Sequence, residues 1–164
     1  MRCPDCGQEN IAGEEICQSC DAPLADLAMP RAKGGVQTKI IEGTIADVNP
    51  HVAIAVAGTS TVADAIKLMR SGKMGCVLVM QEGALAGIFT ERDLLMKIAG
   101  LKDPAQVRLA DVMNHDPQCL SDTDSIAFAF HNMALKGYRH IPISRADGSL
   151  GIISSRDLLR YLCR

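Results

Sequence analysis

The chain contains the same short motifs twice, always 64 positions apart. Ala46-Asp47-Val48 returns as Ala110-Asp111-Val112, and Arg92-Asp93-Leu94-Leu95 returns as Arg156-Asp157-Leu158-Leu159. Because the offset is constant, the two copies align without a gap, and both are expected to form the same supersecondary unit. A chain of this kind is predicted to pair its two units about a pseudo-twofold axis.

Each copy has the residue pattern of a β-α-β-β-α unit. Apolar residues between 62 and 70 fall at helical spacing, and the turns Gln81-Glu82-Gly83 and Ala146-Asp147-Gly148 are typical of hairpins. The sequence therefore predicts a mixed α/β (α+β) fold built from two such units. The predicted strands are 52–56, 76–80, 85–89, 118–120, 140–144 and 150–153, and the predicted helices are 62–70, 126–136 and two segments that begin near Thr90 and Ser154.

Two nine-residue segments carry a specific resemblance. GIFTERDLL at 87–95 and GIISSRDLL at 151–159 resemble the signature of the CBS domain, the regulatory repeat named after cystathionine β-synthase. DVMNHDPQCL and YRHIPI in the second copy are also similar to that family. The resemblance implies CBS repeats at 40–100 and 101–164, packed as a pair with two clefts between them. It also implies a homodimer formed by two such pairs.

Four of the seven cysteines lie in the first twenty residues, as Cys3, Cys6, Cys17 and Cys20. Two C-x2-C pairs can place four thiolates on one metal ion, and a closed tetrahedron leaves no position for water, so the site is predicted to be structural. Gly7 supplies the positive φ that such a turn favours. A segment this short cannot bury enough apolar surface to fold unaided, and bound metal would supply the deficit.

The N-terminal segment resembles the zinc-ribbon family over residues 1–24, which implies bound zinc. Two disulfides are an alternative, although the first residues lack the apolar stretch of a secretion signal. Iron on the same four thiolates is another, because ligand type alone does not separate the two metals. Residues 25–39 contain Pro30, Gly34 and Gly35 without a sustained period, and they are predicted to form a linker.

The composition and the motifs that are missing exclude several classes of function. The net charge is −2, so binding to nucleic acid through bulk electrostatics is not favoured. No apolar run approaches the roughly 20 residues of a membrane helix. We expect a cytoplasmic protein with no membrane partner. There is no phosphate-binding G-x-x-x-x-G-K-[ST] loop and no G-x-S-x-G motif, so the sequence predicts that the protein is not an enzyme.

The resemblance to CBS domains points to adenosine ligands. In that family a T/S-x-x-D at the start of the second helix binds them, and the matching positions are Thr90 with Asp93 and Ser154 with Asp157. A carboxylate can accept both hydroxyls of a ribose, and a helix N-terminus offers free N–H groups to a phosphate. The same four residues also fit an ordinary capping box, which needs no ligand.

The second copy is the better candidate for a binding site. Arg139, His140, Ile141 and Pro142 resemble the strand that in the family lies beside the adenine, with a cation available for a phosphate. The first copy has Gly75-Cys76-Val77-Leu78 at the equivalent place, without the cation or the proline.

These features predict a regulatory module that senses AMP, ADP, ATP or S-adenosylmethionine and acts on an unknown protein partner through its zinc ribbon. The alternative is a protein- or nucleic-acid-binding adaptor in which the CBS pair serves only for dimerisation.

Overall fold

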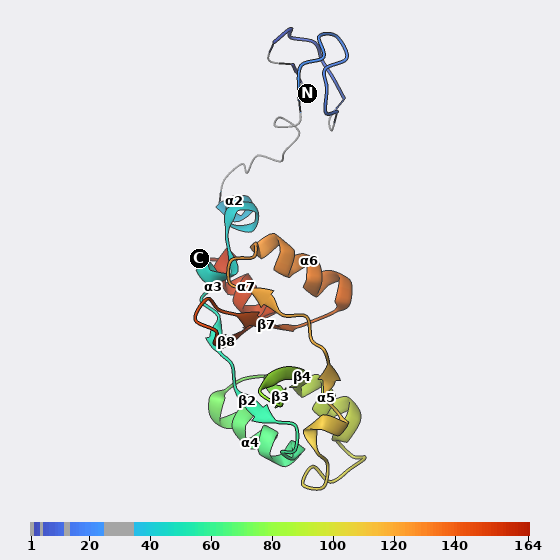
Figure 1. The fold of residues 1–164 in the computed structure, drawn as a ribbon, viewed down its shortest axis with the longest axis vertical. Helices are drawn as coiled ribbons and strands as arrows, with labels where there is room; N and C mark the ends of the chain where they lie inside the picture. Colours follow the sequence, from blue (N-terminus) through green and yellow to red (C-terminus); the bar gives the residue numbers. More distant parts are fainter. Residues whose placement is uncertain (1, 4, 12–13, 25–34) are drawn as a thin grey trace. The chain divides into compact units, whose positions relative to one another are not determined.

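The computed structural model describes residues 2–3, 5–11, 14–24 and 35–164 (Figure 1). The chain forms two compact units, Met1–Thr38 and Lys39–Arg164. Most of the predicted linker, residues 25–34, lies outside the described residues. Residues 35–39 are helical, because α2 spans Gly35–Glu42. Among the described residues, no helix has both the length and the apolar composition that crossing a membrane requires.

The second unit contains two four-stranded sheets, which confirms the mixed α/β prediction. The strand orders are β2-β3-β4-β5 and β1-β8-β7-β6. In both sheets the central pair is an antiparallel hairpin, and a short strand joins it in parallel on one side. The strands are β1 His51–Val52, β2 Ala55–Ala57, β3 Cys76–Gln81, β4 Ala84–Thr90, β5 Asn114–His115, β6 Leu120–Ser121, β7 His140–Ser144 and β8 Leu150–Ser154.

Capping boxes start the helices of both copies. In α4, Thr61 accepts the N–H of Asp64 while Asp64 accepts the N–H of Thr61, and α5 and α7 begin with the same chemistry. In each box two backbone N–H groups that the helix itself cannot satisfy are thereby bonded locally. The remaining helices and helical turns are α3 Ile45–Val48, α4 Val62–Gly72, α5 Glu91–Asp93, η1 Leu94–Ile98, η2 Leu109–Asp111, α6 Ile126–Lys136 and α7 Ser155–Leu162.

The two hydrophobic cores do not follow the two sequence copies. Ile45, from the start of the first copy, is buried in the core formed by α6, β7 and α7 of the second. Leu109 and Met113, from the second copy, are buried in the core formed by α4, β3 and β4 of the first. The leading segments of the copies are therefore exchanged. We call the sheet β2-β3-β4-β5 with its helices the first lobe, and the sheet β1-β8-β7-β6 with its helices the second lobe.

The repeated Gly-Ile dipeptide permits this exchange. β5 pairs with β4 at Gly87, and β1 pairs with β8 at Gly151. A Cβ atom on Gly87 would lie 2.8 Å from Cγ of Met113, and one on Gly151 would lie 3.1 Å from Cβ of Pro50. Both glycines thus provide the space in which the exchanged strand reaches the sheet.

Candidate functional site

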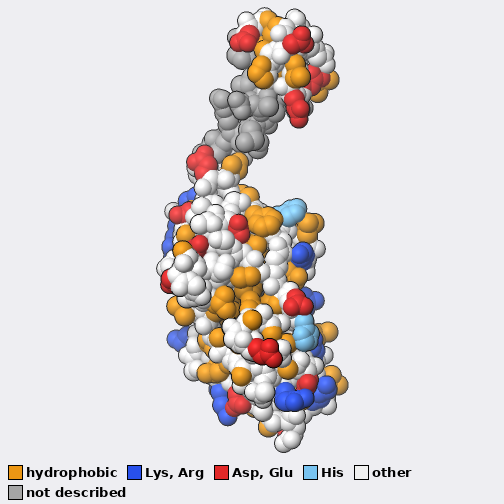
Figure 2. Space-filling model, in the orientation of Figure 1, with side chains coloured by type: hydrophobic (Ala, Val, Ile, Leu, Met, Phe, Trp, Pro, Cys, Tyr) orange, Lys and Arg blue, Asp and Glu red, His pale blue; other side chains and the backbone are white. Residues whose placement is uncertain are grey.

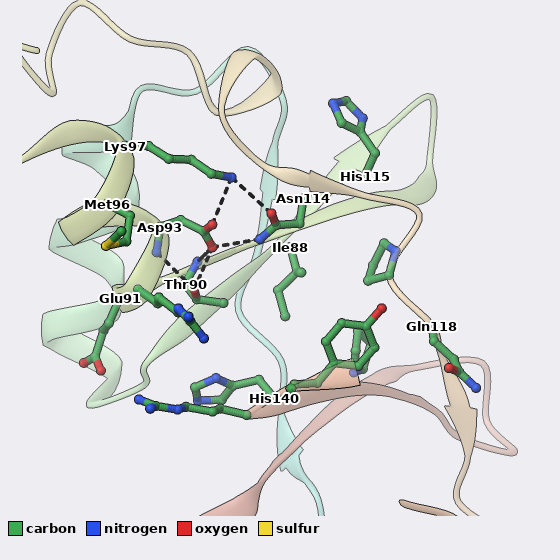
Figure 3. Close-up of a pocket in the computed structure, with 16 residues that line it drawn as sticks. Ile88, Thr90, Glu91, Asp93, Met96, Lys97, Asn114, His115, Gln118 and His140 are labelled. Atoms are coloured by element: carbon green, nitrogen blue, oxygen red, sulfur yellow. Dashed lines mark hydrogen bonds and ion pairs between the residues drawn. The ribbon is translucent and has the colours of Figure 1, made fainter. Parts of the chain in front are cut away.

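A cavity of about 420 Å³ lies between the two lobes. Its walls come from the end of β4 and the start of the following helix in the first lobe, from the segment around β5, and from the start of β7 in the second lobe (Figure 3). This volume falls within the range of small-ligand pockets. The lining residues are Ile88, Thr90, Glu91, Arg92, Asp93, Met96, Lys97, Asn114, His115, Pro117, Gln118, Gly137, Tyr138, Arg139, His140 and Pro142.

Asp93 is the buried acid of this cavity, and 6% of its surface is exposed. Its Oδ2 accepts hydrogen bonds from the Thr90 N–H at 3.0 Å, from the Thr90 hydroxyl at 2.6 Å and from the Asn114 amide at 2.9 Å. Its Oδ1 lies 2.9 Å from the Lys97 ammonium. Burial alone raises the pKa of Asp93, but the bonds from Thr90, Lys97 and Asn114 outweigh burial and hold that pKa below its ordinary value.

Lys97 stands on a π-helical turn. Residues Leu94–Ile98 form this turn, and the N–H of Ala99 donates to the carbonyl of Leu94 at 2.9 Å. Single π turns inside helices are frequent at functional sites. The Lys97 ammonium also donates to the Val112 carbonyl at 2.8 Å and to Asn114 Oδ1 at 3.0 Å. Lys97 therefore connects the capping box to the exchanged segment of the second copy (Figure 3).

The opposite wall of the cavity is formed by alternate side chains of strand β7. His140 and Pro142 line the cavity, while the neighbouring Ile141 is 1% exposed and packs in the core of the second lobe. Successive side chains of a strand face opposite sides, so these three residues cannot all reach one ligand. Burial lowers the pKa of His140 despite the carboxylates of Glu91 and Asp157 nearby. The imidazole is therefore biased toward its neutral form.

The structure brings together five of the eight residues that the sequence singled out for ligand binding. Thr90 and Asp93 belong to the first copy, whereas Arg139, His140 and Pro142 belong to the second. The cavity thus combines the Thr90–Asp93 capping box of the first copy with the start of strand β7 from the second copy. It is not built within the second copy alone. The binding role of each residue stays a prediction.

Ser154 and Asp157, the other predicted pair, do not line this cavity. The Ser154 hydroxyl donates to Asp157 Oδ2 at 2.6 Å, and His51 Nε2 lies 3.3 Å from Asp157 Oδ1. Although burial raises the pKa of Asp157, the bonds from Ser154 and His51 hold it below its ordinary value. The Asp157 carboxylate is therefore also engaged within the protein, by partners that differ from those of Asp93.

Sequence reasoning missed several residues that line the cavity. The second copy has no lysine at the position equivalent to Lys97, since the residue 64 positions later is Tyr161. Asn114 and Tyr138 lie in DVMNHDPQCL and YRHIPI, the segments that resemble the CBS family. The resemblance was a signal that these two segments matter, but only the exchange of the leading segments shows that Asn114 reaches Asp93 of the other copy.

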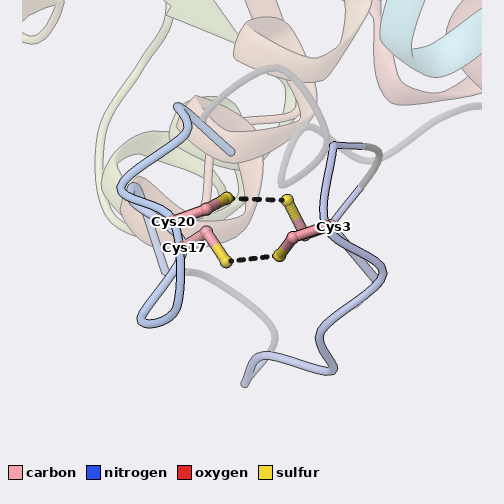
Figure 4. Close-up of side chains that lie close together, drawn as sticks. Cys3, Cys17 and Cys20 are labelled. Atoms are coloured by element: carbon pink, nitrogen blue, oxygen red, sulfur yellow. Dashed lines mark hydrogen bonds between the residues drawn. The ribbon is translucent and has the colours of Figure 1, made fainter.

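The four N-terminal cysteines meet as predicted (Figure 4). Their sulfur atoms all lie within 4.8 Å of one another, with Cys3 to Cys20 and Cys6 to Cys17 both at 3.6 Å. Thiolates bound to a tetrahedral ion at about 2.3 Å would stand roughly 3.8 Å apart, so the cluster has the size that zinc requires. Gly7 has φ +76°, which confirms its predicted role in the first turn.

Asn10 connects the two cysteine pairs. Its side-chain amide donates to the Gln8 carbonyl at 3.0 Å and to Cys17 Sγ at 3.6 Å, and its Oδ1 accepts the Gln18 N–H at 3.1 Å. The Ser19 N–H also donates to Cys17 Sγ at 3.4 Å. This Ser19 bond contributes most to a pKa of Cys17 of about 6, and Asn10 adds to it. These bonds favour the thiolate of Cys17, the form that binds metal. A hydrogen bond from the Ala22 backbone lowers the pKa of Cys20, but the hydrogen bond with Cys6 and burial outweigh it and raise that pKa to about 12.

The fold and the cavity define a tandem-repeat protein whose candidate site lies between its two lobes. The sequence model of the CBS domain matches residues 45–100 and 109–164, and the chain therefore belongs to the CBS domain family.

Curated relatives are similar to this chain over its repeat region. The chain is 33% identical over 106 residues to the mitochondrial CBS domain-containing protein CBSX3 of Arabidopsis thaliana, covering 61% of this chain and 52% of the relative. It is 34% identical over 104 residues to an uncharacterized 17.7 kDa protein of Acidianus ambivalens, covering 62% of each. The chain thus spans between half and two thirds of the length of these relatives.

Solved CBS structures have the same fold. A hexameric CBS-CP12 protein from bloom-forming cyanobacteria is 27% identical with a TM-score of 0.66, over 71% of this chain and 70% of that one. The CBS domain protein PAE2072 from Pyrobaculum aerophilum, complexed with AMP, is 20% identical with a TM-score of 0.63, over 73% and 98%. CBSX2 in complex with AMP is 23% identical with a TM-score of 0.57, over 71% and 93%.

Proposed function

We propose that the protein is a regulatory module that binds an adenine nucleotide in the cavity between its lobes and performs no chemistry on it. The observation that carries this proposal is the juxtaposition of a buried carboxylate, Asp93, with a cation and a proline of the opposite wall, Arg139 and Pro142, around one cavity of about 420 Å³. The AMP complexes of PAE2072 and CBSX2 support the choice of ligand class.

The charge of the cavity favours an anionic ligand. Arg92, Lys97 and Arg139 line it together with Glu91 and Asp93. Since Asp93 is already paired with Lys97, the two arginines face a single further carboxylate. A phosphate would satisfy the excess positive charge, because guanidinium groups bind phosphate oxygens in a bidentate manner. We therefore expect AMP, ADP or ATP to bind more tightly than the cationic S-adenosylmethionine.

Isothermal titration of the full chain with AMP, ADP, ATP and S-adenosylmethionine tests this function. A heat of binding for at least one nucleotide, together with a rise in the melting temperature of the repeat unit, is expected. Absence of both signals with all four ligands would reject nucleotide sensing and leave the adaptor function as the better description.

We propose further that Cys3, Cys6, Cys17 and Cys20 bind one zinc ion and that this ribbon contacts the protein that the module regulates. The sulfur spacing and the thiolate-favouring hydrogen bonds to Cys17 support the metal. Elemental analysis of protein purified without added metal separates zinc from iron, and thiol titration separates both from disulfides.

A homodimer formed by two CBS pairs is also proposed. Apolar side chains lie open on the surface of the repeat unit (Figure 2). Leu95 is 68% exposed, and Leu159, its counterpart 64 positions later, is 57% exposed. A pseudo-symmetric pair of exposed leucines suits a symmetric contact with a second copy. Light scattering of the wild type and of Leu95→Asp tests this arrangement, and a monomeric wild type would reject it.

A further inference from the structure

The Asp93 carboxylate is held by four donors. A carboxylate offers about four lone-pair positions. Oδ2 of Asp93 accepts from the backbone and hydroxyl of Thr90 and from the Asn114 amide, while Oδ1 faces the Lys97 ammonium. Because Oδ2 already accepts three hydrogen bonds and Oδ1 faces one donor, a ribose diol that bonds to both oxygens must displace a partner from Oδ2 and must compete with Lys97 at Oδ1.

The partners differ in how readily they can leave. The two bonds from Thr90 belong to the capping box that starts α5, and losing them would open the first turn of the helix. Asn114 and Lys97 contact Asp93 through their side chains alone, and they also bond to each other at 3.0 Å. Lys97 and Asn114 are thus the partners that a ribose would replace.

A ribose at Oδ1 weakens the pairing of Lys97 with its counter-charge and leaves the ammonium with two neutral acceptors, the Val112 carbonyl and Asn114 Oδ1. An ammonium in a partly enclosed cavity that loses its carboxylate partner is costly unless another anion takes its place. A phosphorylated ligand brings such an anion into the cavity that Lys97 lines, whereas adenosine brings none. The free energy lost when the Asp93–Lys97 contact opens is therefore recovered only by a ligand that carries both a ribose diol and a phosphate.

We infer that Lys97 is a specificity-determining residue that makes this cavity select a nucleotide over the corresponding nucleoside. The inference rests on the proposed function of the cavity and specifies its ligand more closely. The other box is built differently, because Tyr161 occupies the position equivalent to Lys97, and Asp157 Oδ1 lies 3.3 Å from His51 Nε2 and 3.7 Å from the exposed Arg160 guanidinium.

The test compares AMP with adenosine by isothermal titration in the wild type and in Lys97→Met. The wild type is expected to bind AMP at least about tenfold more tightly than adenosine, which is the ratio of one charge-assisted contact. Lys97→Met should lose part of this preference, because AMP binding weakens while adenosine binding stays the same or strengthens, and Arg92 and Arg139 still line the cavity. Lys97→Arg keeps the positive charge and should keep the preference.

Lys67→Met is the matched control. Lys67 lies 3.5 Å from Asp64 of the α4 capping box, it is 78% exposed, and it is not among the residues that line the cavity. Its substitution should leave both affinities unchanged. Thermal melts establish that each variant is folded, and Lys97→Gln replaces Lys97→Met if the latter unfolds.

Two results would overturn the inference. One is a wild type that binds adenosine as tightly as AMP, which needs no variant. The other is a Lys97→Met variant in which both ligands weaken by the same factor. Either result leaves nucleotide binding itself intact, whereas a wild type that binds neither AMP, ADP nor ATP rejects the proposed function and the inference with it.

Discussion

The ammonium of Lys97 lies 2.9 Å from the carboxylate of Asp93, one helical turn earlier in the chain. The same ammonium reaches the Val112 carbonyl at 2.8 Å, so one side chain connects the acid of the first copy to the exchanged segment of the second. Because Val112 is buried in the core of the first lobe, this contact joins the two sequence copies within that lobe.

Substitution of Asp93 should weaken nucleotide binding. Asp93→Asn keeps the shape of the side chain and removes its charge, and we expect AMP affinity to fall about 10- to 100-fold, measured by isothermal titration. Asp64→Asn changes the equivalent acid of the α4 capping box, away from the cavity, and should leave AMP affinity unaltered. Equal losses in the two variants would show that the effect is general destabilisation.

The stability that Asp93 provides should depend on pH. Its folded-state pKa is held below the value of about 3.9 for an unfolded aspartate. Such a group stabilises the fold above about pH 4, and this stabilisation is lost as pH falls through the folded-state pKa. Urea denaturation at several pH values should therefore show that the difference in unfolding free energy between wild type and Asp93→Asn shrinks below about pH 4. A constant difference across this range would contradict the assignment.

Removal of metal should affect the N-terminal unit alone. A chelator is expected to unfold residues 1–24, because the metal replaces a hydrophobic core there. The melting transition of the repeat unit should stay in place, since Lys39–Arg164 is compact by itself. Cys17→Ser should reduce the zinc content, and Cys119→Ser, which alters a cysteine outside the cluster, should not. Full zinc content in Cys17→Ser would reject the site.

Asn10 should act as a positioning residue for the metal ligands. Asn10→Ala removes the amide that contacts Cys17 and bridges the two cysteine pairs. Substitutions of this kind typically cost 10–100-fold in metal affinity, so we expect zinc to be released about tenfold faster to a colorimetric chelator. Gln18→Ala keeps the backbone N–H that Asn10 accepts and serves as the control. Release at the same rate in both variants would argue against this role.

Gly87 should tolerate no larger residue. Gly87→Ala places a Cβ 2.8 Å from Met113 Cγ and 3.0 Å from the Asn114 carbonyl, so β5 must move. We expect a loss of about 1–3 kcal/mol in the free energy of unfolding, measured in urea. Gly151→Ala meets its nearest neighbour at 3.1 Å and should cost less. If Gly87→Ala is the milder of the two, the exchanged strand is not held as closely as the structure indicates.

The sequence was sufficient to predict the features that depend on residues close together in the chain. The two C-x2-C pairs and the T/S-x-x-D boxes act within a few residues, so residue type and spacing are sufficient to predict their geometry. Both kinds of feature form as expected, with the four sulfurs gathered and Thr90 and Ser154 each capping a helix. The constant offset of 64 positions likewise predicted two equivalent lobes.

Only the tertiary structure decided which residues from the two copies share a cavity. Asn114 reaches Asp93 because the leading segment of each copy is buried in the core of the other. His140 lines the same cavity. Nothing in the local pattern specifies this exchange, since Ile45 and Leu109 would be apolar core residues in either lobe. Contacts between residues far apart in the chain depend on strand register and on which core buries a segment, and both are properties of the whole packed fold.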